Sequence, residues 1–191
     1  TSDSRTTDSG NESGIQPVAP DIRLRNIRII AGKYGGRNIT TPPGRRTHPM
    51  GERIRNAMFN SLGPVVDDAE VLDAFAGSGA VGLEAVSRGA AMVTFVEKDR
   101  IAQKVIQENI DKLGAGDSSK LIRASVNNWL ETREEKVFYD LIFADPPYHD
   151  LQIPTIKKLF GLLKPGALMV LSHTGRGEVP IQDGIVVVDN R

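Results

Sequence analysis

An apolar run that resembles a strand ends in four residues that could take part in chemistry: Asp145, Pro146, Pro147 and Tyr148. Proline cannot donate a hydrogen bond to a sheet, so the strand must stop there. The Asp145 side chain and a backbone carbonyl of the Asp-Pro segment could accept both N–H groups of an amine, and Tyr148 offers a stacking face for an unstacked base. Asp145 could also stabilise positive charge on the nitrogen or take its proton. The segment therefore combines a carboxylate, a rigid turn and an aromatic face at one spot, although Asp-Pro-Pro is also an ordinary strand terminator.

A second candidate group lies earlier in the chain, in the stretch DAFAGSGAVG. Here Gly77, Gly79 and Gly82 satisfy the pattern G-x-G-x-x-G, after a predicted strand and at the start of a predicted helix. Glycine lets the backbone approach a ligand closely. Glu97 follows Gly77 by 20 residues, at the end of the next predicted strand, where a carboxylate that binds ribose hydroxyls belongs. This context favours a nucleoside-binding loop over a tight turn that only packs well.

The carboxylate of Asp73 indicates which nucleoside ligand this loop binds. A pyrophosphate is bound by amide N–H groups and a helix N-terminus, so an added carboxylate argues against NAD and an NAD-dependent oxidoreductase. A cationic ligand would be favoured, and S-adenosylmethionine has a sulfonium and an ammonium group and no phosphate. The sequence D-x-F-x-G-x-G resembles motif I of class I methyltransferases, and the resemblance implies that Asp73, Gly77 and Gly79 border the cofactor while Glu97 binds its ribose hydroxyls.

The elements that must position both motifs alternate along the second part of the chain. We predict strands over 70–77, 92–99, 120–125, 139–147 and 166–174, helices over 79–89, 100–114, 127–133 and 151–163, and a last strand over 183–190. Alternating strands and helices, with near-continuously apolar strands, predict an α/β fold with a doubly wound, mostly parallel sheet that is covered on both faces. Ligands of such sheets bind outside the carboxyl ends of the strands, where both motifs are expected.

The preceding part of the chain is predicted to be smaller and basic. Residues 22–64 are expected to form a β-hairpin, with strands over 27–32 and 37–42, and a helix over 51–63. In that helix the spacing places Ile54, Met58, Phe59 and Leu62 on one face, with Arg53 and Arg55 elsewhere. Residues 1–21, rich in Ser, Thr, Asp and Gly, are predicted to be a disordered extension, and 22–191 a single domain with its catalytic core over 65–191.

Charge is segregated along the chain although the net charge is zero. Residues 22–60 contain nine Lys or Arg and one acid, so this segment is +8, whereas residues 1–21 are −3 and residues 61–191 are −5. Such a basic segment favours a polyanionic partner over a merely solvated face. The absence of cysteine excludes disulfides and thiolate chemistry. No apolar run approaches the roughly 20 residues that span a bilayer, so no membrane association is expected.

Three blocks of sequence in this order resemble the RsmD family of bacterial 16S rRNA guanine-N2 methyltransferases. They are RIIAGKYGGRNI with RRTHPMGERIRNAMFNSLG, then VLDAFAGSGAVGLEAVSRGAAMVTFVEKD, and FADPPY. The resemblance runs from about Arg28 through Tyr148 and more loosely to Leu171. It implies a Rossmann-like class I methyltransferase that uses S-adenosylmethionine to methylate the N2 amine of one guanine, G966, on a small-subunit assembly intermediate. It further implies a monomeric, cytoplasmic enzyme.

The resemblance also implies roles for named residues. The segment from Asp145 to Tyr148 resembles the (Asn/Asp)-Pro-Pro-(Tyr/Phe) motif of methyltransferases that modify exocyclic amines and amides, so catalysis is expected at Asp145, Pro146, Pro147 and Tyr148. Cofactor binding is expected at Asp73, Phe75, Gly77, Ser78, Gly79, Glu97, Lys98 and Ser125, where Ser125 occupies the place of the family's usual Asp or Asn beside the adenine. Contacts to RNA phosphates are expected from Arg28, Lys33, Arg37, Arg45, Arg46, Arg53 and Arg55.

Other features are assigned no chemistry. The histidines His48, His149 and His173 are scattered without a metal-ligand pattern, so no metal is expected, and Trp129 is expected to pack a short helix onto the sheet. The family continues past its last strand into a hairpin partner, so the final antiparallel strand is expected to be missing from this chain. Two alternative functions stay open: a DNA methyltransferase acting on adenine N6 or cytosine N4, and an RNA-binding assembly factor without catalysis.

Overall fold

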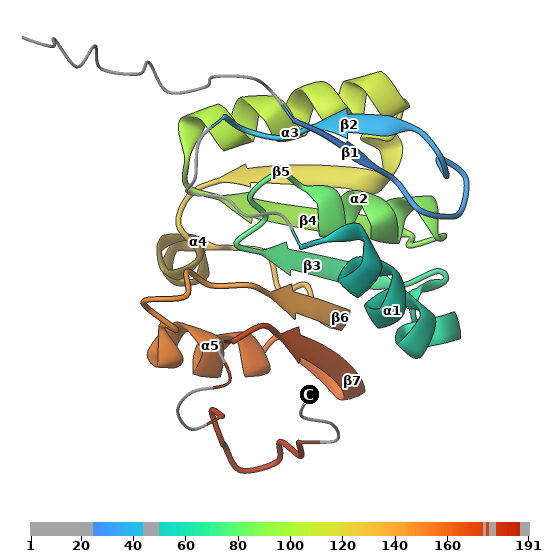
Figure 1. The fold of residues 1–191 in the computed structure, drawn as a ribbon. Helices are drawn as coiled ribbons and strands as arrows, with labels where there is room; N and C mark the ends of the chain where they lie inside the picture. Colours follow the sequence, from blue (N-terminus) through green and yellow to red (C-terminus); the bar gives the residue numbers. More distant parts are fainter. Residues whose placement is uncertain (1–24, 44–49, 174, 176–178, 188–191) are drawn as a thin grey trace, which may run out of the picture.

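The computed structural model describes residues 25–43, 50–173, 175 and 179–187 (Figure 1). A five-stranded sheet lies at the centre, with helices on both faces and a small two-stranded sheet beside it. The predicted extension over 1–21 lies outside the described residues, as do Arg45, Arg46 and His48.

The central sheet is entirely parallel and has the order β5-β4-β3-β6-β7. Its strands are β3 (Glu70–Ala74), β4 (Met92–Glu97), β5 (Ser119–Arg123), β6 (Tyr139–Ala144) and β7 (Leu163–Leu171). Since β3 is in the middle, β4 and β6 flank it, and their carboxyl ends lie next to the carboxyl end of β3. The doubly wound parallel sheet predicted from the sequence is confirmed.

Helices cover both faces of this sheet and enclose a separate core on each. The helices are α1 (Glu52–Leu62), α2 (Ala80–Ser87), α3 (Arg100–Leu113), α4 (Val126–Thr132) and α5 (Ile153–Phe160), with short 3-10 turns η1 (Gly63–Val66) and η2 (Gly116–Ser118). Successive side chains of a strand point to opposite faces, so Val71 of β3 joins the core beneath α1 to α3, while Leu72 joins the core beneath α4 and α5. Trp129 packs against the second core, as predicted.

The hairpin of β1 (Asn26–Arg28) and β2 (Asn38–Thr40) lies against α2 and α3 (Figure 1). Gly32 approaches α2 so closely that a Cβ there would lie 1.9 Å from the carbonyl oxygen of Ser87, and its φ of +82° also favours glycine. On α3, the Asn109 side chain accepts a hydrogen bond from the Thr40 N–H at 2.9 Å and donates one to the Thr40 carbonyl at 2.9 Å. The hairpin is therefore packed onto the helices along its length.

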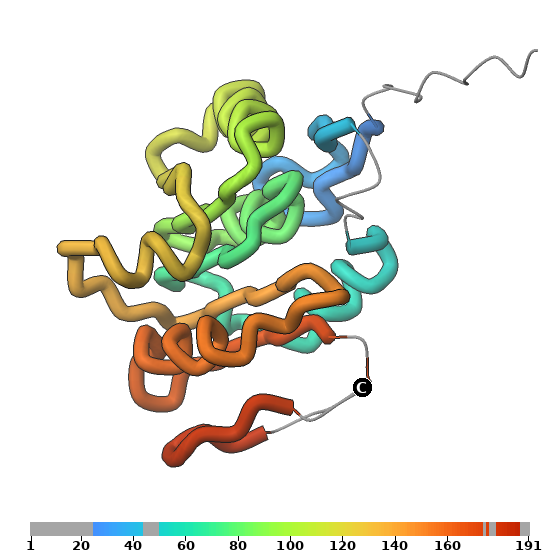
Figure 2. The backbone as a smooth tube through the Cα atoms, turned by 90° about the vertical axis from the view of Figure 1, so that its left-hand side faces the viewer, coloured from blue at the N-terminus to red at the C-terminus, as the bar shows by residue number. Residues whose placement is uncertain are grey.

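The structure differs from the prediction near the C-terminus. The helix predicted to reach 163 ends at Phe160, and Leu163 already belongs to β7, paired with Tyr139 before a register irregularity. The strand predicted over 183–190 is wrong for its described part, because residues 183–187 form a turn and irregular backbone. Figure 2 shows this stretch (red) outside the central sheet. Among the described residues, no helix is long and apolar enough to cross a membrane.

Candidate active site

The residues Asp145 to Tyr148 lie directly beyond the carboxyl end of β6, which stops at Ala144. Pro146 is buried, whereas the Tyr148 side chain is 65% exposed. Asp145 is partly buried, and this burial raises the pKa of its carboxyl group, while a hydrogen bond from Ser172 acts to lower it. The prolines thus fix a carboxylate at the sheet edge, next to an aromatic ring that is open to a partner.

The glycine loop lies beside this motif, because it follows β3, the strand that pairs with β6. The chain turns through three left-handed residues, Phe75 (φ 60°), Gly77 (φ 57°) and Gly79 (φ 78°), before α2 begins at Ala80. Phe75 has a side chain, and a non-glycine residue in this conformation costs of order 1 kcal/mol. Backbone strain of this kind is concentrated at ligand-binding sites. Here the strained residue lies at the carboxyl ends of the strands, where ligands of such sheets bind.

Glu97 at the end of β4 is connected directly to the glycine loop. Its two carboxylate oxygens accept hydrogen bonds at 2.7 Å, Oε2 from the N–H of Gly77 and Oε1 from the N–H of Asp99. The structure therefore places the Glu97 carboxylate next to the backbone of Gly77. The side chain is 9% exposed, so the carboxylate is held rigidly at the rim of the loop.

Asp73, in contrast, is buried beneath the loop and only 4% exposed. Its Oδ2 accepts a hydrogen bond from the N–H of Gly82 at 2.9 Å, which connects β3 to the first turn of α2. A Cβ at Gly82 would lie 2.2 Å from a ring carbon of Phe95 and 2.9 Å from Oδ2 of Asp73, so only glycine fits. Burial holds the pKa of Asp73 well above its usual range, against the effect of the Gly82 N–H.

Carboxylates from three adjacent strands meet near the loop. The negative charges of Asp145 and Glu97 act, after burial, to raise the pKa of Asp73. Like charges that share a poorly hydrated region destabilise one another. The edge of the sheet beside the glycine loop therefore carries several acidic groups.

Two further predicted cofactor residues lie at the same edge. Lys98 directly follows Glu97 and is exposed. Ser125, two residues beyond β5, caps α4, and its hydroxyl accepts a hydrogen bond from the N–H of Asn128 at 3.2 Å. The hydroxyl of Ser125 therefore has a structural role of its own, and contact with an adenine remains a prediction.

The described arginines and lysine predicted to bind RNA occupy three different environments. Arg53 is exposed at the start of α1, and Arg28 is exposed but forms an ion pair with Glu52. Lys33 and Arg37 lie at the opposite edge of the molecule, because the Lys33 N–H donates to the Ser87 carbonyl at the end of α2 and the Arg37 guanidinium donates to carbonyls at the end of α3. Contacts from these two residues would fall away from the carboxyl edge of the sheet, where the glycine loop and the segment from Asp145 to Tyr148 lie.

The prediction for Arg55 is wrong, because its side chain is fully buried. It donates hydrogen bonds to the carbonyls of Met50 at 3.1 Å and Arg28 at 2.6 Å, and its Nε lies 3.7 Å from Oε2 of Glu84. Burial lowers the pKa of Arg55, and the charge of Glu84 opposes this effect. Ile54, predicted to share one face with Phe59 and Leu62, is 64% exposed although those two residues are buried. The helix is rotated so that an arginine, not an isoleucine, faces α2.

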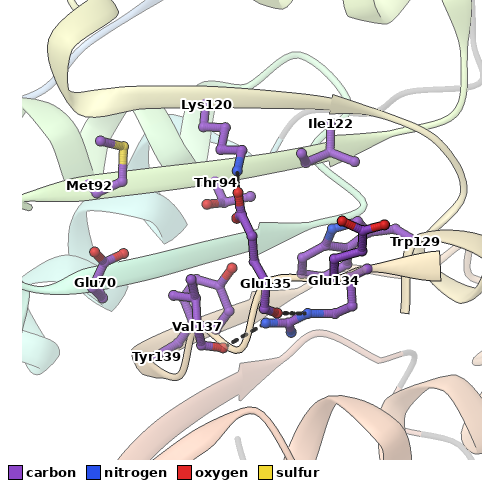
Figure 3. Close-up of a pocket in the computed structure, with 11 residues that line it drawn as sticks. Glu70, Met92, Thr94, Lys120, Ile122, Trp129, Glu134, Glu135, Val137 and Tyr139 are labelled. Carbon is purple, nitrogen blue, oxygen red and sulfur yellow. Dashed lines mark hydrogen bonds and ion pairs between the residues drawn. The ribbon is translucent and has the colours of Figure 1, made fainter. Parts of the chain in front are cut away.

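A cavity of about 420 Å³ lies away from these motifs (Figure 3). It is lined by the first residues of three strands, Glu70, Met92 and Tyr139, and is bordered by the ion pair of Lys120 with Glu135. These positions are the amino ends of the strands, opposite the glycine loop. Within the described part of the chain, no group of three His, Cys, Asp or Glu residues is arranged to hold a metal ion.

The sheet order, the strained glycine loop and the motif after β6 define a Rossmann-like class I methyltransferase. A family model described as "Conserved hypothetical protein 95" matches residues 27–190. The chain is 35% identical over 147 residues to "Ribosomal RNA small subunit methyltransferase D" of Haemophilus influenzae, covering 75% of this chain and 76% of the relative. The chain belongs to this family, the RsmD family of RNA methyltransferases.

Two further relatives agree with this assignment. The protein of the same name from Escherichia coli K12 is 38% identical over 122 residues, which are 64% of this chain and 60% of the relative. The Escherichia coli structure solved as "Putative methyltransferase yhhF" is 36% identical, with a TM-score of 0.71, covering 82% of this chain and 86% of that chain. The fold therefore agrees with a methyltransferase, and the sequence places the chain among the RNA methyltransferases.

Two polar residues of the structure were missed by reasoning from the sequence. Glu84 is a fully buried carboxylate in α2, and its presence in an otherwise apolar helix was the available signal. Ser172 ends up beside Asp145, but this follows from the pairing of β6 with β7, and strand order is not written in local sequence.

Proposed function

We propose that this RNA methyltransferase acts on the exocyclic N2 amine of a guanine in 16S rRNA, G966, with S-adenosylmethionine as the methyl donor. The position of Asp145 supports the proposal most strongly, since it lies one strand away from the glycine loop at the carboxyl edge of the sheet. A base amine bound at Asp145 and a cofactor bound at the loop would therefore be neighbours.

The residues at the loop fit this cofactor. When bound, S-adenosylmethionine supplies an electrophilic methyl group on a positively charged sulfonium. The left-handed turn at Gly77 and Gly79 exposes backbone without side chains, and Glu97 presents a fixed carboxylate to ribose hydroxyls. The raised pKa of Asp73 reflects burial and the neighbouring negative charges that a cationic ligand would offset.

The residues after β6 fit the chemistry of an aromatic amine. The lone pair of such an amine is delocalised into the ring, so it must be oriented before it can attack. The Asp145 carboxylate accepts one N–H and a carbonyl of the Asp-Pro segment accepts the other, while the exposed ring of Tyr148 stacks on the base. Asp145 also stabilises the positive charge that develops on the nitrogen, whose proton is then lost to Asp145 or to water.

The proposal can be tested by transfer of labelled methyl groups to small-subunit particles isolated from cells that lack the native enzyme. Nucleoside analysis should then yield N2-methylguanosine, and sequencing of the modified RNA should place it at G966. Free 16S rRNA, added as a second substrate, distinguishes an assembled particle from naked RNA. Methylation of DNA but not rRNA would support an adenine-N6 or cytosine-N4 DNA enzyme, and RNA binding without methylation would support an assembly factor.

The position of the basic side chains predicts which of them contacts RNA near the target base. Arg53→Ala is expected to raise the KM for the particle several-fold at unchanged kcat. The slope of the logarithm of the RNA-binding constant against the logarithm of salt concentration should become shallower by about one, because one phosphate contact is lost. Lys33→Ala removes an equal charge from the opposite edge and is the matched control. Equal effects of the two variants would show that the hairpin turn also contacts the RNA.

A further inference from the structure

The end of β7 brings an unassigned hydroxyl group next to the catalytic motif. The last paired residues of β6 and β7 are Ala144 and Leu171, so Asp145 and Ser172 are the next residues on these two neighbouring strands. The N–H of Ser172 donates to the Ala144 carbonyl at 2.9 Å, which holds the backbone of the two strands together up to this point. The register therefore places Ser172 and Asp145 side by side at the ends of the two strands.

Asp145 needs such a neighbour, because its own loop offers few donors. The two residues that follow it, Pro146 and Pro147, have no backbone N–H to donate. Burial raises the pKa of Asp145, and a hydrogen bond from Ser172 is the influence that acts in the opposite direction. A carboxylate that is partly withdrawn from water and has no donor would be both protonated more easily and free to rotate.

Other titratable groups around Asp145 do not provide this contact. On β3, Asp73 is negatively charged when ionised and points its Oδ2 to the N–H of Gly82. Beyond β7, His173 uses Nδ1 to accept a hydrogen bond from the N–H of Gly175 at 3.1 Å. On the loop itself, Tyr148 and His149 are exposed to solvent.

We propose that Ser172 is a positioning residue, whose hydroxyl donates a hydrogen bond to one oxygen of the Asp145 carboxylate and directs the other oxygen toward the substrate amine. Ser172 does not touch the reacting atoms and acts only through Asp145. The inference rests on the proposed function, because orientation of Asp145 matters only if Asp145 binds the amine. If the Asp145 carboxylate rotated, the substrate amine that donates its N–H group to it would be misplaced. Small misplacements of a reacting group have large effects on rate.

The test compares Ser172→Ala with Ser172→Thr, which keeps the hydroxyl group. For Ser172→Ala we expect kcat to fall about tenfold at unchanged KM for S-adenosylmethionine, and the acid limb of the kcat profile to move to higher pH. The hydroxyl group of Ser172 acts to lower the pKa of Asp145, so its removal raises that pKa. Asp145 is then protonated, and the enzyme inactivated, at a higher pH than in the wild type. Ser172→Thr should restore both properties, and Ser119→Ala, at the distant amino end of β5, should leave both unchanged.

A second measurement does not depend on turnover. Titration of the Asp145 side-chain carboxyl carbon by NMR, in wild type and Ser172→Ala with matching thermal melting curves, should show a higher pKa in the variant. An unchanged carboxyl titration together with unchanged kcat in Ser172→Ala would overturn the inference. Absence of methyl transfer by the wild-type protein would instead refute the proposed function, and the NMR titration would still report on the contact between Ser172 and Asp145.

Discussion

Replacing Asp145 with alanine is expected to reduce kcat for methyl transfer by about 1,000-fold, while the dissociation constant for S-adenosylmethionine changes little. The variant loses the acceptor that orients the amine and the negative charge that stabilises the developing cation. Cofactor binding should persist, because the glycine loop and Glu97 are held by hydrogen bonds of their own. Single-turnover methylation of the small-subunit particle and calorimetric titration with the cofactor would measure the two effects separately.

Two matched variants sharpen this prediction. Asp145→Asn keeps an oxygen acceptor at the same place but not the charge, so its kcat should lie between those of wild type and Asp145→Ala. Asp150→Ala removes an exposed carboxylate from the same loop, one that accepts a hydrogen bond only from the Gln152 N–H among the described contacts, and should retain nearly full activity. Activity of Asp145→Ala close to that of wild type would show that the motif only terminates β6.

Replacing Glu84 with alanine is expected to destabilise the protein by about 3–5 kcal/mol, because it leaves the buried charge of Arg55 without its partner. Both side chains are fully buried. Oε1 of Glu84 also accepts a hydrogen bond from Arg88 at 2.8 Å, and its two oxygens accept from the N–H groups of Ile30 at 2.9 Å and Ala31 at 3.1 Å. The alanine variant would therefore leave the hairpin, α1 and α2 with buried donors that have no acceptor.

Urea unfolding followed by tryptophan fluorescence would measure the loss, since Trp129 is the single tryptophan. Glu84→Gln keeps the shape and one acceptor oxygen and should be destabilised less. Glu52→Ala removes an acidic residue from the same region and is the control, because it breaks only the exposed ion pair with Arg28. We expect it to lower the free energy of unfolding far less than Glu84→Ala does. Similar unfolding curves for Glu84→Ala and Glu52→Ala would contradict a structural role for the buried pair.

The parts of the site that could be predicted from the sequence depend on local patterns. Gly77 follows β3 and Glu97 ends β4, and parallel β-α-β units commonly place consecutive strands side by side, so the location of both residues at the carboxyl edge could be predicted from the sequence. For Asp145, the expectation that its strand joins the same sheet predicted the carboxyl edge, whereas its place next to the glycine loop depends on the pairing of β6 with β3. Residue types, spacing and the rule for carboxyl ends were sufficient for both motifs.

The remaining features depend on packing between distant segments. Arg55 was assigned to RNA as part of a basic segment and through the family resemblance. Arginine is rarely buried, and only the buried acid on α2 explains why the Arg55 side chain is buried here. The apolar stretch at 183–187 had the composition of a strand but lacks a partner strand among the described residues, since β7 pairs only with β6 there. The amino-acid composition of a segment indicates its preference for β-strand. Whether the segment forms a strand depends on whether a partner strand lies next to it.

Helix α2 makes the basic hairpin and the catalytic core mutually dependent parts. Its first turn is held to β3 by the Gly82–Asp73 hydrogen bond, and its last turns hold the hairpin through Glu84 and Ser87. The hairpin therefore depends on contacts with α2 for its position and is not an independent module. A transplant of the hairpin into a relative would therefore have to include the facing side of α2, the helix that begins directly after the glycine loop.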